Sequence, residues 1–450
     1  MSVNGFNEND FAERLNEVVS PSRPIRSVEY LYGREEYLET IKRALYQSGR
    51  HIFIYGDRGV GKSSLGATAA LQYQSSDATP IFVSGSVDDS FKTVIANIAN
   101  LALGRSRVEN TKSTKYIGIE WRGLKWGGGV EISAIDIASQ IQSVGDAADL
   151  LREIASKHSQ KPIVVIDEFD AIQNVEERNK FASLLKQLGD QSINIKFIFT
   201  GIGKTLDELL GSHLSAYRQL ETIELPRLSW EGRREIVIKA AQAFSLDIDD
   251  NVNWRIAMVS DGYPYYVQLI TEKMLWEAFD DEEKVEKVTS KHYQMGLRRA
   301  ISSINAELKR PYEQAVVHRD DIYETVVWAT ADGDNLDREG KDMYLSFTNL
   351  QNKRYSTPNL ISQSEFSEYL RKLKKSAYGE ILVSIEKHIG WYTYKEKMLR
   401  GYVRIQAEAN GIELRGETEL PRQQMRVPSN VRTGLHTSLV PRGIKLRDDK

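Results

Sequence analysis

The stretch that decides the fold is a glycine-rich loop with the sequence Gly56-Asp57-Arg58-Gly59-Val60-Gly61-Lys62-Ser63. An apolar run, residues 51–55, comes directly before it, and a helical pattern rich in Ala and Leu follows over residues 63–73. Glycines let the backbone of such a loop curl until its N–H groups converge on phosphate oxygens. The helix that begins at the loop adds the positive end of its dipole. Strand, glycine loop, Lys-Ser and helix together predict a phosphate-binding P-loop.

The residue types of the loop suit a nucleoside triphosphate. A lysine in the place of Lys62 reaches the β- and γ-phosphates, and a hydroxyl in the place of Ser63 binds Mg²⁺. We therefore expect ATP and Mg²⁺ as cofactors, held by residues 56–63 and by Ser64. The alternative is a glycine-rich turn before an ordinary helix.

Composition sets outer bounds on the function. The 450 residues can form several domains, and a net charge of −3 confines any nucleic-acid affinity to a local surface. Because there is no cysteine, disulfides, thiolate metal sites and cysteine nucleophiles are excluded. Residues 1–10 lack the apolar centre of a signal peptide, and no run approaches the length of a membrane span. We expect a cytoplasmic protein that does not enter membranes.

A second polar motif lies about 100 residues after the P-loop. The apolar run 162–166 is continuous, as in strands of a buried parallel sheet, and it ends in Asp167-Glu168. Ligands of open α/β sheets bind at the carboxyl ends of the strands. This pattern predicts that Asp167 holds Mg²⁺ and that Glu168 orients and polarises an attacking water.

The segment ahead of the P-loop carries a family resemblance. Gly33-Arg34-Glu35 stands before a helical pattern, some 20 residues ahead of the glycine loop. That placement resembles the entry segment of AAA+ and STAND-type ATPases. The resemblance implies an α/β fold with a parallel-sheet P-loop core over residues 29–228, and it implies that Gly33 and Arg34 lie against the adenine.

Two further site residues follow from this resemblance. Thr200 ends the apolar run 195–199, where the family has its sensor 1, a polar residue that contacts the γ-phosphate or the water. Arg218 precedes the strand-like run 221–225, where the family carries an arginine finger that completes the site of a neighbouring copy in a homo-oligomer. The alternatives are a threonine that merely ends its strand and an arginine that merely faces solvent, with Arg227 as a weaker candidate for the finger.

Residues 104–135 interrupt the alternation of strands and helices. Runs at 116–121 and 130–133 predict a hairpin around Gly127-Gly128-Gly129. Its tryptophans and basic residues suit either contact with a partner or packing of an insertion on the core.

After the core, residues 229–308 are entirely helical in pattern, as expected of the lid that follows an AAA+ core. Gly262-Tyr263-Pro264 opens the third helix, with Pro264 in its first turn. Related origin-recognition ATPases have an arginine at this place, the sensor 2. The Gly-x-Pro sequence resembles STAND ATPases instead, and it implies that Pro264 borders the nucleotide.

Residues 309–415 resemble a winged helix. Helical patterns at 311–331, 343–352 and 364–375 precede strand-like runs at 380–386 and 402–407. Residues 353–404 hold 11 basic and 5 acidic side chains, which suits a helix in a DNA groove and a wing on phosphates. The predicted nucleic-acid contacts are basic residues of the third helix and the wing: Arg371, Lys372, Lys374, Lys375, Lys395, Lys397 and Arg400. Residues 1–28 are expected to be an extended N-terminal extension, and residues 416–450 a flexible basic tail.

Two functions fit these observations. The first is a molecular switch that binds and hydrolyses ATP and reports its state to double-stranded DNA through the winged helix. The second is a STAND-type signalling or defence ATPase whose winged helix contacts protein and not nucleic acid. A metabolic kinase is disfavoured because Asp167-Glu168 suits water as the acceptor.

Overall fold

The computed structural model describes residues 3, 5–75, 78–104, 119–121, 124–126, 134–203, 206, 218–386 and 388–416. Its central feature is a five-stranded sheet in the order β2-β5-β6-β1-β7, in which every neighbouring pair is parallel. The strands are β1 (His51–Tyr55), β2 (Ile81–Ser84), β5 (Ile163–Asp167), β6 (Lys196–Gly201) and β7 (Leu220–Glu224). The predicted α/β class with a parallel sheet is confirmed.

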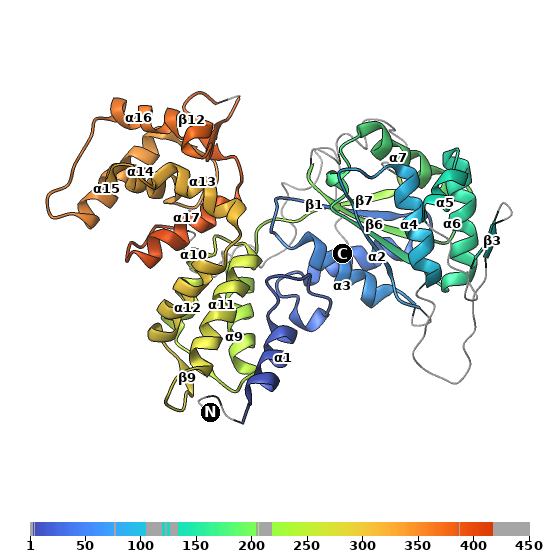
Figure 1. The fold of residues 1–450 in the computed structure, drawn as a ribbon, viewed down its shortest axis with the longest axis horizontal. Helices are drawn as coiled ribbons and strands as arrows, with labels where there is room; N and C mark the ends of the chain where they lie inside the picture. The colour runs from blue at the N-terminus through green and yellow to red at the C-terminus, as the bar shows by residue number, and fades with distance from the viewer. Residues whose placement is uncertain are drawn as a thin grey trace, which may run out of the picture. The chain divides into compact units, whose positions relative to one another are not determined.

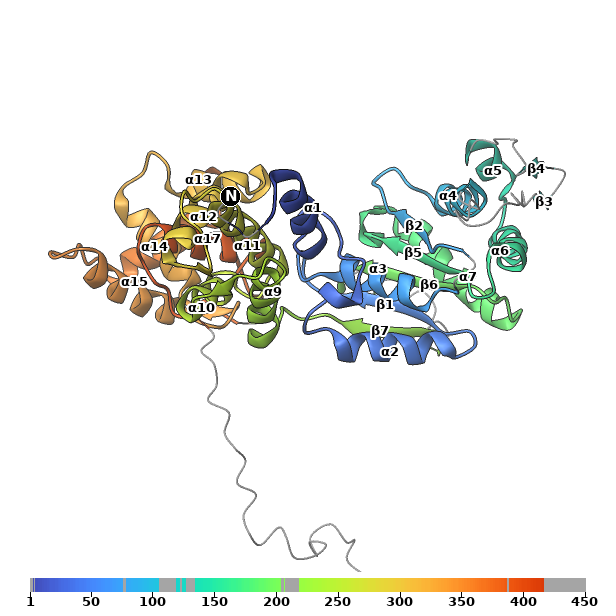
Figure 2. The same ribbon diagram turned by 90° about the horizontal axis from the view of Figure 1, so that it is seen from below.

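Helices cover both faces of this sheet (Figures 1 and 2). One face carries α2 (Glu35–Tyr46) and α3 (Lys62–Tyr73); the other carries α4 (Phe91–Gly104), α6 (Val144–His158) and α7 (Val175–Asp190). Because successive side chains of a strand point to opposite faces, Ile52 and Ile54 join the core beneath α2 and α3, while Phe53 joins the core beneath α4 and α7. Consecutive apolar residues of β1 are thus buried on both faces of the sheet.

The insertion after α4 differs from the prediction. Its described part contains β3 (Ile119–Trp121) paired antiparallel with β4 (Leu124–Trp126), followed by α5 (Ala134–Gln140). The hairpin therefore turns before the three glycines, and the expected second strand at 130–133 lies outside the described residues. Trp121 is buried in the core beneath α4 and α6, so it packs internally.

The lid consists of α9 (Trp230–Gln242), α10 (Asp250–Val259), α11 (Pro264–Phe279) and α12 (Ser290–Ser303). Ser229 caps α9 by accepting from the N–H of Gly232, and Pro264 stands in the first turn of α11. The expectation of helices alone needs a small correction, because β8 (Asp247–Ile248) and β9 (Lys287–Val288) form a short parallel pair between them.

The N-terminal extension is partly helical, contrary to the expected extended segment. Helix α1 (Glu8–Val18) begins at Asn7, whose side chain accepts from the N–H of Asp10. Its Phe11 is fully buried and stacks on Phe279 of the lid, with ring centroids 4.4 Å apart. Polar composition concealed this helix because only one face of it packs against the lid.

The C-terminal region of the described chain runs helix, helix, strand, helix, helix, strand, strand, helix. These elements are α13 (Ala306–Val316), α14 (Asp321–Ala331), β10 (Arg338–Glu339), α15 (Gly340–Arg354), α16 (Gln363–Lys372), β11 (Leu382–Ser384), β12 (Trp391–Tyr394) and α17 (Met398–Ala409). Strand β12 pairs antiparallel with both β10 and β11. None of the described helices has the length and apolar character needed to cross a bilayer.

Two predictions for this region are wrong. The first helix, expected over 311–331, is two helices, α13 and α14. The run 402–407, expected to be a strand, lies inside α17, which is buried on nearly all sides, Arg400, Arg404 and Glu408 included. A short apolar run cannot distinguish a buried helix from a strand by periodicity.

Candidate active site

A cleft of about 720 Å³ opens at the carboxyl ends of β5 and β6 and at the start of α3. The first turn of α11 borders it, as do residues 20–24 after α1 and the segment between β12 and α17. Its lining includes polar residues of the P-loop helix and of the strand ends: Lys62, Ser63, Ser64, Asp167, Glu168, Asp170 and Thr200. The two motifs that the sequence separates by about 100 residues therefore meet in one cavity.

The loop before α3 has the backbone that its glycines permit. Gly56, Gly59 and Gly61 all have positive φ angles, 153°, 80° and 97°. A Cβ on Gly56 would lie 2.4 Å from the carbonyl oxygen of Leu225, so no side chain fits there. The Lys62 ammonium donates to the carbonyls of Gly56 (3.0 Å) and Asp57 (2.8 Å), and burial lowers its pKa against the opposing effect of nearby carboxylates, Asp170 first.

The first turn of α3 and the end of β6 each bring one hydroxyl to the carboxylate at the end of β5. Ser63 Oγ donates to Asp167 Oδ1 over 2.8 Å, and the Thr200 hydroxyl donates to the same oxygen. The N–H of Glu168 in turn donates to Thr200 Oγ1 over 3.1 Å. The Glu168 side chain is exposed and lines the cleft, so its carboxylate is accessible to a small molecule there.

This arrangement agrees with a comparison against protein families, in which residues 30–198 match the AAA ATPase domain. Residues 30–198 form an AAA+ P-loop ATPase domain. The protein is accordingly an ATP-hydrolysing enzyme.

The fold of this ATPase resembles that of solved structures with little sequence identity. The Walker-type ATPase PABY2304 of Pyrococcus abyssi is 15% identical, with a TM-score of 0.50 over 85% of this chain and 99% of its own. The ORC2 protein of Aeropyrum pernix is 11% identical, with a TM-score of 0.46 over 88% of this chain and 98% of its own. The ORC1 protein of the same organism, solved in complex with DNA, is 13% identical, with a TM-score of 0.43 over 85% of this chain and 94% of its own. No curated protein matches the sequence significantly.

The entry segment of the ATPase supports the P-loop from behind. Arg34 is buried, and its guanidinium donates to the carbonyls of Val60 (3.1 Å) and Pro226 (2.7 Å). Burial lowers its pKa to about 10. Gly33 has a positive φ of 64° and packs against Gly232 of α9. Neither residue lines the cleft. The Arg34 guanidinium bonds with the backbone of the loop and of Pro226, and the contact of Gly33 and Arg34 with adenine stays a prediction.

Segment 20–25, which the sequence marked only by its prolines, borders the cleft instead. Ser20 N–H donates to Gln268 Oε1 of α11 over 3.1 Å. Ile25 N–H donates to Ser64 Oγ (3.1 Å), and the Thr68 hydroxyl donates to the Ile25 carbonyl (3.0 Å). The segment thus joins the lid to α3 at the cleft, which Pro264 also lines.

The two arginines considered as fingers differ in their surroundings. Arg218 is exposed just before β7, as a residue that serves a neighbouring copy must be, and its role stays a prediction. Arg227 donates to Asp261 Oδ1 (2.8 Å) and to the Asp261 carbonyl (3.0 Å). It is therefore engaged within its own chain.

Sequence reasoning missed the residues that connect the C-terminal region to the P-loop. Lys397 Nζ pairs with Asp57 Oδ1 over 2.9 Å, and Arg58 pairs with Glu307 of α13 over 3.1 Å. Met398 lines the cleft, and a Cβ on Gly59 would lie 2.3 Å from its sulfur. No local signal marks such contacts, because their partners lie hundreds of residues apart.

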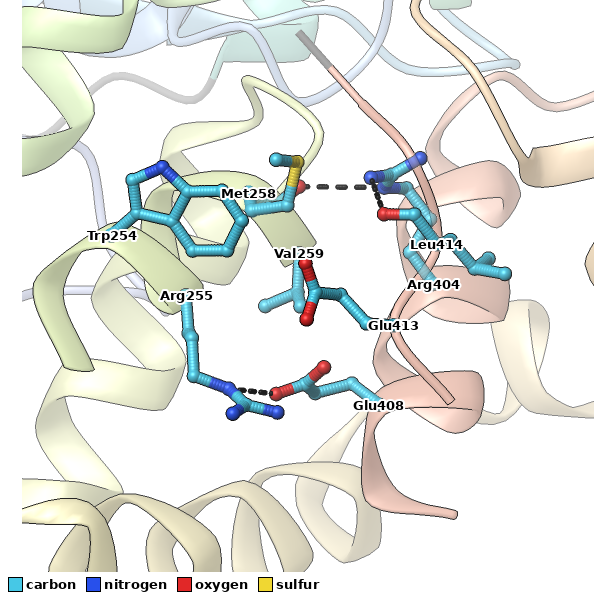
Figure 3. Close-up of a pocket in the computed structure, with 8 residues that line it drawn as sticks. All are labelled: Trp254, Arg255, Met258, Val259, Arg404, Glu408, Glu413 and Leu414. Carbon is cyan, nitrogen blue, oxygen red and sulfur yellow. Dashed lines mark hydrogen bonds and ion pairs between the residues drawn. The ribbon is translucent and has the colours of Figure 1, made fainter. Parts of the chain in front are cut away.

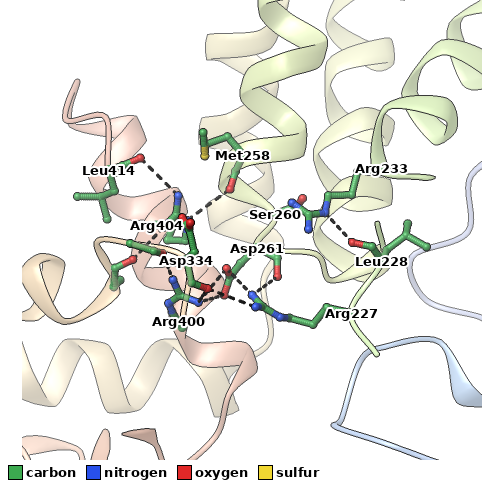
Figure 4. Close-up of polar contacts among 12 residues, drawn as sticks. Arg227, Leu228, Arg233, Met258, Ser260, Asp261, Asp334, Arg400, Arg404 and Leu414 are labelled. Atoms are coloured by element: carbon green, nitrogen blue, oxygen red, sulfur yellow. Dashed lines mark hydrogen bonds and ion pairs between the residues drawn. The ribbon is translucent and has the colours of Figure 1, made fainter. Parts of the chain in front are cut away.

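Helix α17 is fastened to the lid by buried polar contacts. Arg400 is fully buried; it pairs with Asp261 Oδ1 (3.1 Å) and donates to the carbonyls of Gly333 and Asp334 (Figure 4). Farther along α17, Glu408 accepts from Arg255 Nε of α10 over 2.6 Å, beside a small cavity (Figure 3). We call the set Arg227, Asp261 and Arg400 the lid joint.

These contacts correct part of the predicted nucleic-acid surface. Arg400 faces the protein interior, and Lys397 faces the P-loop. Lys395 pairs with Glu380 at 2.7 Å, Lys374 donates to Ser384 Oγ at 2.8 Å, and the Lys372 ammonium lies 5.2 Å from the ring centre of Tyr369. Arg371 and Lys375 are exposed at the end of α16. For these two residues and for Lys372, Lys374 and Lys395, contact with nucleic acid stays a prediction.

Proposed function

We propose that this ATPase is a molecular switch whose C-terminal region senses the nucleotide and presents a DNA-binding surface. The observation that carries the proposal is the path of residues 394–398. Strand β12 ends at Tyr394, and four residues later Met398 lines the nucleotide cleft. A change in the cleft therefore has a short covalent route to the β11–β12 hairpin.

For hydrolysis we assign roles by position in the cleft. Lys62 would neutralise charge on the β- and γ-phosphates once its bonds to the loop carbonyls are exchanged for phosphate oxygens. Glu168 would hold the attacking water and accept its proton. Thr200, as a sensor of the γ-phosphate or the water, and Arg218, as a finger from a second copy, would both act in hydrolysis. Binding of the nucleotide needs neither of them.

The residues present fit Mg²⁺. Ser63 Oγ and Asp167 Oδ1 lie 2.8 Å apart in the cleft, and hydroxyl and carboxylate oxygens are the ligands that this ion prefers. Ser63 and Asp167 would hold it. When bound, Mg²⁺ supplies charge neutralisation of the phosphates.

The proposed DNA surface is the end of α16 together with the β11–β12 hairpin. The order of α14, β10, α15, α16, β11 and β12 is that of a winged helix. Arg371 and Lys375 extend from the end of the second-last helix, and His388, Ile389 and Trp391 are exposed in the hairpin. A cationic helix end beside an exposed hairpin suits a helix in a groove and a wing on the adjacent backbone.

The test measures binding of a generic DNA duplex by fluorescence anisotropy at several salt concentrations. Two states are compared: the Glu168→Gln variant with ATP and the wild type with ADP. We expect affinity to fall with salt and to differ between the two nucleotides. Arg371→Ala with Lys375→Ala should reduce the slope of log affinity against log salt by roughly 0.9 per lost phosphate contact. Lys239→Ala, on an exposed face of α9, is the control and should leave the slope unchanged.

A protein partner is the second candidate, favoured by the hairpin apex. Ile389 is fully exposed (103%), and Trp391 is 36% exposed, an apolar pair that suits a protein surface. If duplex DNA neither binds nor changes the ATPase rate while ATP changes the particle mass in light scattering, the DNA proposal fails. The signalling function would then stand.

A further inference from the structure

The Thr200 hydroxyl uses its one proton and one of its two lone pairs in hydrogen bonds within the protein. It donates its single proton to Asp167 Oδ1 and accepts the N–H of Glu168 over 3.1 Å. The residue is almost completely buried, at 1% exposure. A hydroxyl carries one proton, so Thr200 cannot donate to a phosphate or to a water while it holds Asp167.

The backbone at Glu168, whose N–H donates to Thr200, has an uncommon conformation. Glu168 has a φ of 51° and ψ of 43°, the left-handed region that side chains other than glycine seldom adopt. Its carbonyl accepts from Ala171 N–H (2.8 Å), and the preceding carbonyl of Asp167 accepts from Gly85 N–H (2.7 Å). Such a conformation persists only where surrounding contacts fix it.

Gly85 provides the third constraint. It follows strand β2, whose Ser84 stands beside Asp167 in the sheet. A Cβ on Gly85 would lie 2.5 Å from the Glu168 carbonyl oxygen. Because that atom is backbone, the contact would have to be relieved by moving the peptide that carries the Glu168 side chain.

We propose that Thr200 and Gly85 are positioning residues that hold the Asp167–Glu168 peptide, so that Thr200 acts on ATP hydrolysis through Glu168 and not by contact with the phosphate. Buried between β5 and β6, the hydroxyl fixes the metal-side carboxylate and the direction of the Glu168 side chain together. Gly85 leaves room for this arrangement from the other side of β5. The inference rests on the proposed role of Glu168 as the base.

The first experiment compares Thr200→Val, which keeps the shape and removes the hydroxyl, with Thr200→Ser, which keeps the hydroxyl. Thr200→Val should lower kcat on the order of 100-fold, the cost of a reactant misplaced by about 1 Å, with little change in the affinity for a fluorescent ATP analogue. Thr200→Ser should stay within a few-fold of wild type. Equal losses in both variants, or a loss of ATP affinity without loss of kcat, would overturn the proposal.

The second experiment asks whether Thr200 acts through Glu168. In a Glu168→Gln background, Thr200→Val should cause little further loss of single-turnover hydrolysis, because residues that act as a unit are not additive. Multiplied losses would mean an independent contact with the phosphate, and the inference would fail while the proposed function stood. If Glu168→Gln alone hydrolyses like wild type, the assignment of the base fails first.

Gly85→Ala supplies a test that leaves every polar group in place. We expect kcat to fall at least 10-fold with nucleotide affinity retained. Gly145→Ala is the matched control: a Cβ there lies 3.5 Å from its nearest neighbour, in ordinary contact, so kcat should not change. A Gly85→Ala enzyme with wild-type kcat would show that the peptide does not need this space.

Discussion

The nucleotide cleft and the lid joint both gather charged and polar residues, but they differ in access to water. In the cleft, Lys62, Asp167 and Glu168 lie at strand and helix ends around a cavity of about 720 Å³. In the lid joint, Arg400 and Asp261 are buried, at 0% and 6% exposure. Groups that act on a substrate must be accessible to it, whereas Arg400 and Asp261 of the joint are buried and bond with protein atoms.

Charged residues thus serve two purposes in this chain: those of the cleft are accessible to a substrate, and those of the lid joint hold elements of the fold together. Removing ions from water costs several kcal/mol each, and pairing recovers this cost only when geometry and hydrogen bonds are good. In the lid joint, Arg400 has a carboxylate and two backbone carbonyls as partners, while its Nε is buried without a hydrogen-bond partner among the described residues. The contacts of Arg400 fix the start of α17, which directly follows the residues that border the cleft.

The largest expected effect lies in the cleft. Lys62→Ala removes the cation beside the phosphates, so the ATPase rate should fall roughly 100-fold or more, and ATP should bind more weakly. The unfolding midpoint should change little, because the lost contacts are to two loop carbonyls. Steady-state kinetics and urea unfolding on the same preparation check both statements. A large loss of stability in Lys62→Ala would contradict the difference between the cleft and the lid joint.

The lid joint should show the reverse behaviour. Asp261→Asn keeps the shape and tolerates the positive φ of 52°, but it leaves Arg400 buried without a counter-charge. We expect the free energy of unfolding to fall by about 3 kcal/mol, measured by urea titration.

The matched control for the joint is Asp250→Asn. Asp250 is 96% exposed and lies 3.6 Å from its partner, Arg234, so stability should be nearly unchanged. Equal stability of the two asparagine variants would contradict a structural role of the joint.

The smallest effect is expected where the two regions meet. Lys397→Ala removes the partly exposed pair with Asp57, which is worth about 0.5 kcal/mol, so release of a fluorescent ADP should accelerate about 2-fold. Lys395→Ala, two residues earlier and paired with Glu380, is the control. Identical release rates in both variants would show that the Lys397–Asp57 pair does not take part in coupling the cleft to the hairpin.

Much of the core could be predicted because its signals are local. A glycine loop needs particular φ angles, and an apolar strand ending in Asp-Glu presents both groups at the sheet edge, so Gly56, Lys62 and Asp167 could be named from short patterns. For Arg34 the sequence indicates a place near the P-loop but not the partners of its guanidinium. Its partners, Val60 and Pro226, belong to two other segments.

The C-terminal region was predicted less well for the same physical reason. The sequence predicts a surface cation at Arg400 because arginine is usually exposed, and only its distant partner Asp261 makes burial possible. Residues 402–407 resemble a strand in the sequence because α17 is apolar on several sides. Both errors come from partners that lie outside any local window.

The sequence by itself determined the parallel α/β ATPase core, the phosphate loop and the acidic strand end, since each depends on backbone conformations that few residue types allow. Tertiary structure alone decided that Thr200 binds Asp167 and Glu168, that segment 20–25 joins lid to core, and that Met398 borders the nucleotide cleft. Those arrangements depend on which surfaces bury one another, and burial is a property of the whole chain.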